Sequence, residues 1–302
     1  MGVLQASRRL VECIGKNRIL KNVPLKEHTT FKTGGKARYL IVPKSAGEIQ
    51  FIISLCSEHH LNWYIIGRGS NIIVSDKGFN GLIIKIQDGF NKIEVDGENM
   101  NVQSGALLSQ IAITALEHHL TGLEFAAGIP GSLGGAVVMN AGAFDGEMSQ
   151  IVKGLRAVNS RGQIVYLEKE DLKFGYRSSL FKQEPYVILE VDLELKKGKY
   201  EEIQAKMKEF NDRRKEKQPL KYPSAGSVFK RPEGYFAGKL IEDAGLKGLR
   251  IGDAQVSPLH AGFIVNLGDA TSQDILDLIA VIKNTVYEKF GVHLEEEVKI
   301  LK

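Results

Sequence analysis

The stretch Gly128-Ile-Pro-Gly-Ser-Leu-Gly-Gly-Ala-Val-Val-Met-Asn-Ala-Gly-Ala-Phe144 is the most informative part of this sequence. Its glycines are bounded by apolar residues rather than by a flexible linker. Glycine loses much conformational freedom on folding, so a cluster indicates backbone that turns tightly or lies close to another group. The N–H groups of such a loop can hold a pyrophosphate. A structural loop with tight turns is an equally good interpretation of this stretch alone.

A second glycine-bearing loop, Gly67-Arg-Gly-Ser-Asn71, follows an apolar segment at 63–66 that predicts a buried strand. Neither loop matches the GxxxxGK[ST] pattern of a P-loop. Neither matches the GxGxxG pattern of a Rossmann domain, with its acid about 20 residues further on. Two such loops can instead hold one long dinucleotide such as FAD, with the pyrophosphate at one loop and the flavin at the other. The spacing alone does not decide between an FAD site and loops with a purely structural role.

The composition is that of an ordinary globular protein, with 302 residues, 43% of them hydrophobic and 25% charged. No run of 18 apolar residues and no signal peptide is present, so we expect a cytoplasmic protein without membrane insertion. The net charge of +4 is too small to predict a nucleic-acid partner. Cys13 and Cys56 are far apart and no His/Cys cluster occurs, so we expect neither a disulfide nor a metal site.

The chain is predicted to contain three successive units, at 1–85, 86–215 and 216–302. Residues 1–85 alternate strand and helix patterns, as in a small α/β unit, with strands expected at 37–42, 63–66, 72–74 and 82–86 and a helix at 46–60. Residues 86–215 predict an α+β unit with a largely antiparallel sheet, with strands at 92–95, 100–103, 155–158, 163–167 and 186–195 and helices at 107–120 and 200–217. In the last unit we expect a helix at 235–244, a strand at 262–266, a long helix after a capping box of Thr271 and Asp274, and a strand at 292–301.

Three sites combine reactive side chains with turn-forming or extended sequence. Arg177, in Phe174-Gly-Tyr-Arg-Ser-Ser179, has a fixed charge and a fork of donors suited to a carboxylate or an enolate. Ser227 follows a glycine in a loop that leads into the last unit. In a strand, Glu295 and Glu297 would share one face. The commoner roles of these residue types are a surface ion pair, a turn residue and a solvated acidic surface.

Six segments together resemble the UDP-N-acetylenolpyruvoylglucosamine reductase (MurB) family, and they occur in that family's order: Gly67-Arg-Gly-Ser-Asn71, Gly128-Ile-Pro-Gly-Ser-Leu-Gly-Gly135, Asn140-Ala-Gly142, Tyr176-Arg-Ser-Ser179, Ala225-Gly-Ser-Val-Phe-Lys230 and Leu294-Glu-Glu-Glu-Val298. The resemblance extends from about Leu25 to the C-terminus, and the ordered set is highly specific. The chain resembles the shorter subtype, because it has no long tyrosine-bearing insertion between Arg177 and Ser227. Tyr176, Tyr235 or the segment around His260 would then cover the substrate.

The resemblance implies an α+β fold with a two-part FAD-binding domain of the vanillyl-alcohol-oxidase (PCMH) type, made by 1–85 and 86–215. An α/β C-terminal substrate domain, 216–302, would follow. It further implies a cytoplasmic flavoenzyme of peptidoglycan precursor synthesis, with non-covalent FAD, NADPH as co-substrate, a UDP-sugar substrate and no obligate protein partner. Two alternatives are another flavin oxidoreductase of the same FAD-domain type and a nucleotide-binding module without catalysis.

The resemblance also implies roles for individual residues. Arg177 and Glu297 would stabilise an enolate, which a glutamate can do only as the protonated acid or through a bound proton donor, and Ser227 would donate the final proton. The residues expected to bind FAD are Thr33, Gly34, Gly67, Arg68, Gly69, Ser70, Asn71, Ala127, Gly128, Ile129, Pro130, Gly131, Gly134, Gly135, Asn140, Gly142 and Ala143. Those expected to bind substrate are Tyr176, Lys230, Arg231 and His260. Arg231 departs from the family pattern, which often has Asn there; an arginine is compatible with a diphosphate.

Overall fold

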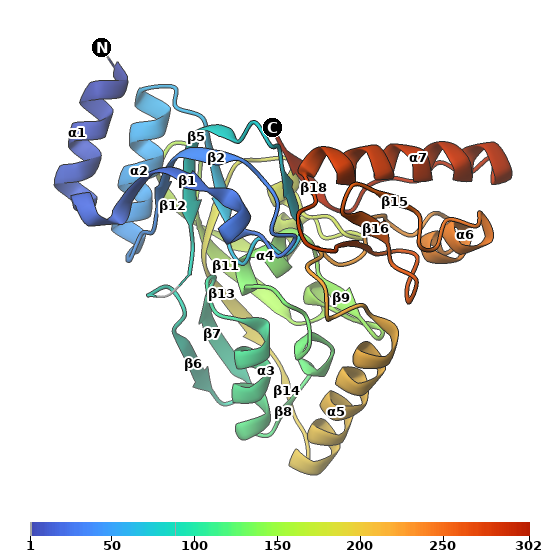
Figure 1. Ribbon diagram of the computed structural model, residues 1–302. Helices are drawn as coiled ribbons and strands as arrows, with labels where there is room; N and C mark the ends of the chain where they lie inside the picture. The colour runs from blue at the N-terminus through green and yellow to red at the C-terminus, as the bar shows by residue number, and fades with distance from the viewer. Residues whose placement is uncertain (1, 88) are drawn as a thin grey trace. The chain divides into compact units, whose positions relative to one another are not determined.

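The computed structural model describes residues 2–87 and 89–302, and the chain forms two compact units. The first unit contains the segments up to 21, 39–68 and 81–212, and the second contains 22–38, 69–80 and 213–302. Figure 1 gives the element labels used below. The three-part division at residues 85 and 215 stays a prediction.

A five-stranded antiparallel sheet forms the centre of the first unit (Figure 1). Its strands, in spatial order, are β12 (Ile164–Glu168), β11 (Val152–Val158), β13 (Val187–Glu194), β7 (Asn99–Gln103) and β6 (Ile93–Asp96). Alternation along β13 buries Val191 and Leu193 and leaves Asp192 between them on the other face. The buried residues of α3 (Leu108–Glu117) and α4 (Leu133–Val138) join the same core. The antiparallel sheet expected from the sequence is confirmed.

A second sheet has the strand order β1 (Ile19–Pro24), β2 (Lys36–Ile41), β5 (Phe79–Lys85) and β3 (Trp63–Ile66), with β3 and β5 parallel. Helix α2 (Ala46–Glu58) begins after Ser45, whose hydroxyl accepts a hydrogen bond from the Glu48 N–H at 3.2 Å. The stripe of Ile49, Ile52 and Ile53 is fully buried in the accompanying core. Helix α1 (Gly2–Ile14) was not predicted from the sequence.

The second unit contains the antiparallel strands β15 (Arg250–Ile251), β16 (Ala254–Val256) and β17 (Ile264–Asn266), with helices α6 (Ala237–Asp243) and α7 (Ser272–Phe290). One core of buried residues joins these elements, whose ribbons Figure 1 draws. The predicted capping box is confirmed, because the Thr271 hydroxyl accepts from the Asp274 N–H and the Asp274 carboxylate accepts from the Thr271 N–H. Short strand β4 (Ile72–Val74) pairs in parallel with β18 (Lys299–Leu301).

The predicted strand at 292–301 is wrong over most of its length, since regular pairing begins only at Lys299. Before it, Glu296 makes an isolated bridge to Phe229. Helix α5 (Tyr200–Lys217) has the predicted bounds. The remaining strands form two short antiparallel pairs. Strands β9 (Gly142–Ala143) and β10 (Gly146–Glu147) are joined by a short turn, whereas β8 (Leu120–Thr121) and β14 (Lys196–Lys197) are far apart in the sequence. Within the described ranges, no helix has the length and apolar character needed to cross a membrane.

Candidate active site

The glycine-rich run and the start of the Gly67–Asn71 loop approach each other within the first unit, which includes Gly67 and Arg68 but not residues 69–71. A Cβ on Gly67 would overlap the hydroxyl of Ser132, which is the residue before α4. Around them, the Leu108 N–H donates to the Gly131 carbonyl at 3.1 Å, and the Leu133 N–H donates to the Ala106 carbonyl at 2.9 Å. A side chain at position 67 would therefore have to displace the Ser132 side chain, and glycine avoids this overlap. Ser132 was not among the predicted site residues, although a serine before a helix is a common N-cap signal.

Two features fit the binding of a large polar cofactor. Gly135 lies exposed in α4, and a Cβ there would meet only the Ser132 hydroxyl, at 3.8 Å, so protein packing does not require a glycine. A bare backbone at an exposed position instead permits close approach of a ligand. In the second unit, Thr33 is 3% exposed and its Oγ1 has no hydrogen-bond partner among the described residues. A buried hydroxyl of this kind is normally satisfied, and a bound FAD would supply a partner.

The turn that carries Arg177 is tied to the end of the glycine-rich run by three side-chain bonds. The Asn140 amide donates to the Gly175 carbonyl at 3.1 Å, and the Ser179 hydroxyl donates to the Val138 carbonyl at 2.7 Å. Arg177 Nη2 donates to the Gly142 carbonyl at 2.9 Å. Arg177 itself has φ of 51°, a left-handed conformation that costs of order 1–3 kcal/mol for a non-glycine residue. The surrounding bonds hold this strained residue in one place.

Asn140 and Tyr176 take different positions around this turn. Asn140 is 1% exposed, and its Oδ1 also accepts from the Ser149 N–H at 2.9 Å, so both ends of its side chain bind protein backbone. Its role in FAD binding stays a prediction. Tyr176 is 52% exposed, and its ring centroid lies 5.4 Å from the Arg177 guanidinium carbon. The structure thus brings Tyr176 and Arg177 together, as their sequence adjacency suggested.

The segment carrying Ser227 is held between two other segments of the second unit. The Val228 N–H donates to the Gly262 carbonyl at 2.9 Å, and Ser227 is bridged to Phe263. On the other side, the Glu297 N–H donates to the Val228 carbonyl at 2.8 Å. The structure therefore places the backbones of Ser227 and Glu297 close together, although 70 positions separate them in the sequence.

The three successive glutamates have different surroundings. Glu295 forms an ion pair with Lys230, and Glu296 forms one with Lys283 at 2.7 Å. The two negative charges that precede Glu297 in the sequence are thus each matched by a lysine. Lys230, which was expected to bind substrate, is engaged with Glu295 in this structure.

The surroundings of His260 lower its pKa and so favour the neutral imidazole. Burial is the main cause of the lower pKa, and the positive charge of Lys247 acts in the same direction. A hydrogen bond with the backbone of His260 itself and the charge of Glu242 oppose the shift. Its Nδ1 accepts a hydrogen bond from the Gly262 N–H at 3.1 Å, so the ring proton is on Nε2.

Arg231 has a partner that the sequence did not indicate. Its guanidinium carbon lies 3.9 Å from the ring centroid of Phe236, whose side chain is 61% exposed. An exposed aromatic ring in this position restricts the arginine by a cation–π contact. The only signal in the sequence was the presence of aromatic residues five positions downstream, which does not specify a contact.

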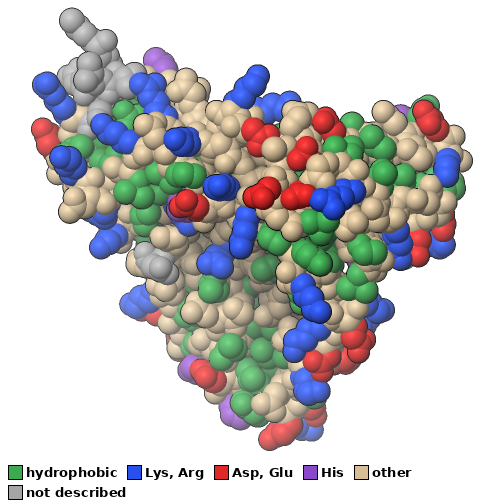
Figure 2. Space-filling view, in the orientation of Figure 1, with side chains coloured by type: hydrophobic (Ala, Val, Ile, Leu, Met, Phe, Trp, Pro, Cys, Tyr) green, Lys and Arg blue, Asp and Glu red, His purple; other side chains and the backbone are tan. Residues whose placement is uncertain are grey.

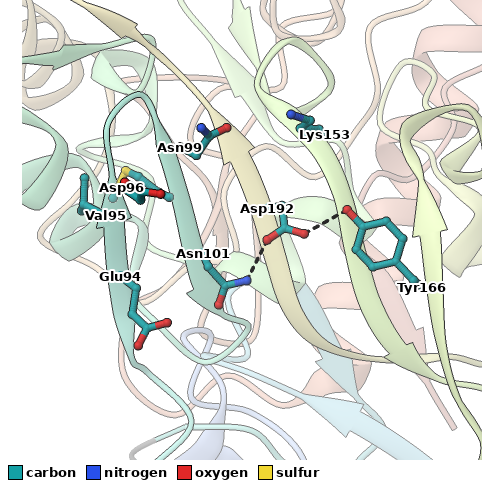
Figure 3. A pocket seen from close by; sticks show the side chains of 9 residues that line it. Glu94, Val95, Asp96, Asn99, Asn101, Lys153, Tyr166 and Asp192 are labelled. Carbon is teal, nitrogen blue, oxygen red and sulfur yellow. Dashed lines mark hydrogen bonds between the residues drawn. The ribbon is translucent and has the colours of Figure 1, made fainter.

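A cavity of about 450 Å³ lies over one face of the five-stranded sheet (Figure 3). In it, Asp192 accepts hydrogen bonds from Asn101 at 2.7 Å and from the Tyr166 hydroxyl at 2.9 Å. Partial burial and the Asp192 carboxylate raise the pKa of Tyr166 to about 12. No predicted site residue lines this cavity, so it lends no support to the FAD assignment.

The face of the molecule drawn in Figure 2 carries charges of both signs. Figure 2 shows Lys and Arg side chains spread among Asp and Glu on the face that it draws. Among the residues that the structure describes, no group of three or more His, Cys, Asp and Glu side chains could hold a metal ion.

Comparison with known proteins defines the class of the chain first. A model of an FAD-binding domain matches residues 37–168, so the chain is an FAD-binding protein. Residues 218–301 match the C-terminal domain of UDP-N-acetylenolpyruvoylglucosamine reductase. The chain belongs to the UDP-N-acetylenolpyruvoylglucosamine reductase family. The predicted α+β fold, with an FAD-binding domain followed by a C-terminal domain of this family, is confirmed.

The similarity covers the whole length of the relatives. The chain is 49% identical over 301 residues to the UDP-N-acetylenolpyruvoylglucosamine reductase of Alkaliphilus oremlandii, covering 100% of this chain and 99% of the relative. It is 47% identical over 298 residues to that of Clostridium novyi, covering 99% and 97%. The crystal structure of the reductase from Thermus caldophilus matches with a TM-score of 0.81 and 36% identity, covering 94% of this chain and 98% of the other.

Proposed function

We propose that this protein reduces the enolpyruvyl group of UDP-N-acetylglucosamine enolpyruvate to give UDP-N-acetylmuramate, a precursor of peptidoglycan. The similarity to reductases of this name at 47–49% identity over nearly the full chain carries the proposal. The enzyme is an oxidoreductase with FAD as cofactor and NADPH as co-substrate. Its product serves cell wall synthesis and hence cell shape and division. We place the reaction in the cytoplasm, without an obligate protein partner.

The FAD is held non-covalently by the backbone-rich loops at 67–71 and 127–135, with Thr33, Gly34, Asn140, Gly142 and Ala143. Support comes from the contact between Gly67 and Ser132, the open backbone at Gly135 and the unsatisfied hydroxyl of Thr33. When bound, FAD would supply the chemistry of hydride transfer from NADPH to the methylene carbon of the enolpyruvyl group.

Arg177 and Glu297 stabilise the negative charge that develops on the substrate. Addition of a hydride to the methylene carbon leaves charge on the carboxylate-bearing carbon, which spreads into the carboxylate as an enolate. The fixed charge and forked donors of Arg177 suit that group, and its left-handed backbone is held by the bond to Gly142. Glu297 contributes a hydrogen bond to that group, either as the protonated acid or through a bound proton donor.

Ser227 donates the proton that completes the reaction at the carboxylate-bearing carbon. A free serine is a weak acid, so the hydroxyl must be polarised where it is held. The two-sided backbone pairing of 227–228 gives the fixed position that such a donor needs. Tyr176, Lys230, Arg231 and His260 bind the substrate, with Arg231 suited to the diphosphate and the neutral His260 to a substrate oxygen.

The test separates the two half-reactions with the Ser227→Ala variant. NADPH-dependent bleaching of the flavin should proceed at the wild-type rate, because the hydroxyl takes no part in it. Reoxidation by UDP-N-acetylglucosamine enolpyruvate should slow by roughly 10²–10⁴-fold, the usual contribution of a positioned acid. Stopped-flow absorbance of the flavin measures both rates.

Ser224→Ala serves as a matched control, since it removes a hydroxyl from the same segment outside the proposed site. Both of its half-reactions should match those of the wild type. Equal reoxidation rates for Ser227→Ala and the wild type would refute the proton-donor role. A wild-type protein that is reduced by NADPH but not reoxidised by this substrate would refute the proposed function.

A further inference from the structure

Asn71 connects the predicted cofactor loop to the segment that carries Glu297. Its side-chain Nδ2 donates to the Glu297 carbonyl at 3.3 Å. Its own carbonyl accepts from the Lys299 N–H at 3.0 Å. A single residue thus binds the chain on both sides of Val298, within the second unit.

These bonds extend the short parallel pairing of β4 and β18. That pairing aligns Ile72 with Lys299 and ends there, because the Glu297 N–H turns away to the Val228 carbonyl. The amide of Asn71 supplies the next donor, which in a continuing ladder would be a backbone N–H. The side chain therefore takes the place of one ladder bond at the point where the strand stops.

The peptide groups on both sides of the Glu297 Cα are consequently fixed. The preceding peptide donates its N–H to Val228, and the following peptide offers its carbonyl to Asn71. Glu297 lies outside a regular strand, so few other backbone bonds set its direction. Without the Asn71 donor, a partly buried carbonyl would lose its protein partner and the Glu297 backbone would gain freedom.

We propose that Asn71 is a positioning residue for Glu297, which aims the Glu297 side chain at the reacting group of the substrate. This inference rests on the proposed function, in which Glu297 is catalytic. It assigns Asn71 a task distinct from the cofactor binding expected of its loop. Misplacement of a catalytic group by about 1 Å can cost on the order of 100-fold in rate.

The experiment compares Asn71→Ala with Asn71→Asp, which keeps the shape of asparagine but has no donor and places a carboxylate oxygen against the Glu297 carbonyl. Because the loop that carries Asn71 is expected to hold FAD, both variants are saturated with FAD, and each half-reaction is measured on flavin-loaded protein. We expect flavin reduction by NADPH to slow by less than reoxidation does. Reoxidation by UDP-N-acetylglucosamine enolpyruvate should fall by about 10-fold to 100-fold, as a lower kcat with little change in KM. Circular dichroism melting shows that each variant is folded.

A double variant tests whether Asn71 acts through Glu297. In a Glu297→Gln background, Asn71→Ala should lower the reoxidation rate by less than about 2-fold, because the group that it positions is already lost. If Asn71→Ala lowered the reoxidation rate by the same factor in the wild-type background and in the Glu297→Gln background, the two residues would act independently and the proposal would be overturned. Ser70→Ala is the control in the same loop, and it should change FAD affinity without this dependence on Glu297.

The outcomes also separate this inference from the function on which it rests. Loss of flavin from Asn71→Ala, with normal reoxidation of the molecules that retain it, would make Asn71 a cofactor residue and overturn the proposal. Full activity of both Asn71 variants would overturn it as well. A wild-type enzyme that the substrate fails to reoxidise would instead contradict the proposed function.

Discussion

Gly67 and Ser132 illustrate how single residues bring the two glycine-bearing loops together. Gly67→Ala places a methyl group on the Ser132 hydroxyl, so we expect a loss of about 1–3 kcal/mol in the free energy of unfolding and a lower FAD content. Urea unfolding and the flavin absorbance of the purified protein measure the two effects.

The same pair supplies its own controls. Ser132→Ala alone should have little effect, because its side chain makes no capping hydrogen bond to α4. In the double variant the new methyl group faces only the Cβ of residue 132, at 3.4 Å, so much of the lost stability should return. Gly47→Ala, inside α2 where the added Cβ has room, should be neutral or stabilising by up to about 1 kcal/mol. A destabilised double variant would contradict the explanation by overlap with the hydroxyl.

His260 gives the stability of the protein a defined dependence on pH. Burial lowers its pKa in the folded state below the ordinary value of 6.5, so the unfolded chain takes up the proton first. The contribution of neutral His260 to the free energy of unfolding is therefore fully present above pH 6.5. It is lost as the pH falls through the folded-state pKa. Protonation also places a hydrogen on Nδ1 and breaks the bond from Gly262.

The His260→Gln variant removes this titration. Between pH 7.5 and pH 5.0, the wild type should lose more unfolding free energy than the variant, as measured by urea titration at each pH. Above about pH 7, the unfolding free energies of the two proteins should differ by a constant amount. A constant difference across the range would mean that His260 has the same pKa in both states.

At the scale of elements, the N-terminus of α7 depends on its capping box. Thr271→Ala removes the acceptor for the Asp274 N–H, so it should lower the free energy of unfolding by about 0.5–2 kcal/mol. Thr271→Ser retains the hydroxyl and should lose much less. Thermal melting of the two variants beside the wild type measures the difference, and equal losses would show that the methyl group of Thr271 matters rather than the cap.

The elements that the sequence predicted well are those whose signals are local. Helix α5 has its apolar stripe in its own residues, and α7 has both stripe and cap, so their positions followed from periodicity. The segment 294–298 was misjudged because an extended apolar and acidic pattern does not reveal the bonding partner. Its bonds go to Val228 and Lys230, far away in the sequence, instead of to a regular ladder.

The site was predictable in the same uneven way. Motif order indicated Arg177, Ser227 and Glu297 and the glycine loops. It did not indicate that Lys230 pairs with Glu295, that Arg231 stacks on Phe236 or that Asn71 reaches Glu297. Each of these contacts depends on loop geometry, which single-residue patterns do not encode.

At the scale of the whole molecule, FAD should be part of the folding equilibrium. A ligand that binds only the folded state stabilises it, by about 2.7 kcal/mol at a free concentration 100 times its Kd. Removal of FAD should therefore lower the melting temperature, and its addition should restore it. A melting temperature independent of FAD would contradict binding to the folded protein.

Thr33 allows the contribution of one expected FAD contact to the folding equilibrium to be measured. Its buried Oγ1 has no partner among the described residues, so Thr33→Val should stabilise the FAD-free protein by about 1 kcal/mol, since an unsatisfied hydroxyl is removed. If FAD supplies the missing partner, the same change must reduce the stabilisation that FAD provides. Calorimetry gives the melting temperatures of the wild type and the variant, each with and without FAD, and so the stabilisation by FAD in each protein. An apo-protein stabilised by the valine, together with an undiminished effect of FAD, would show that the Thr33 hydroxyl does not contact the cofactor.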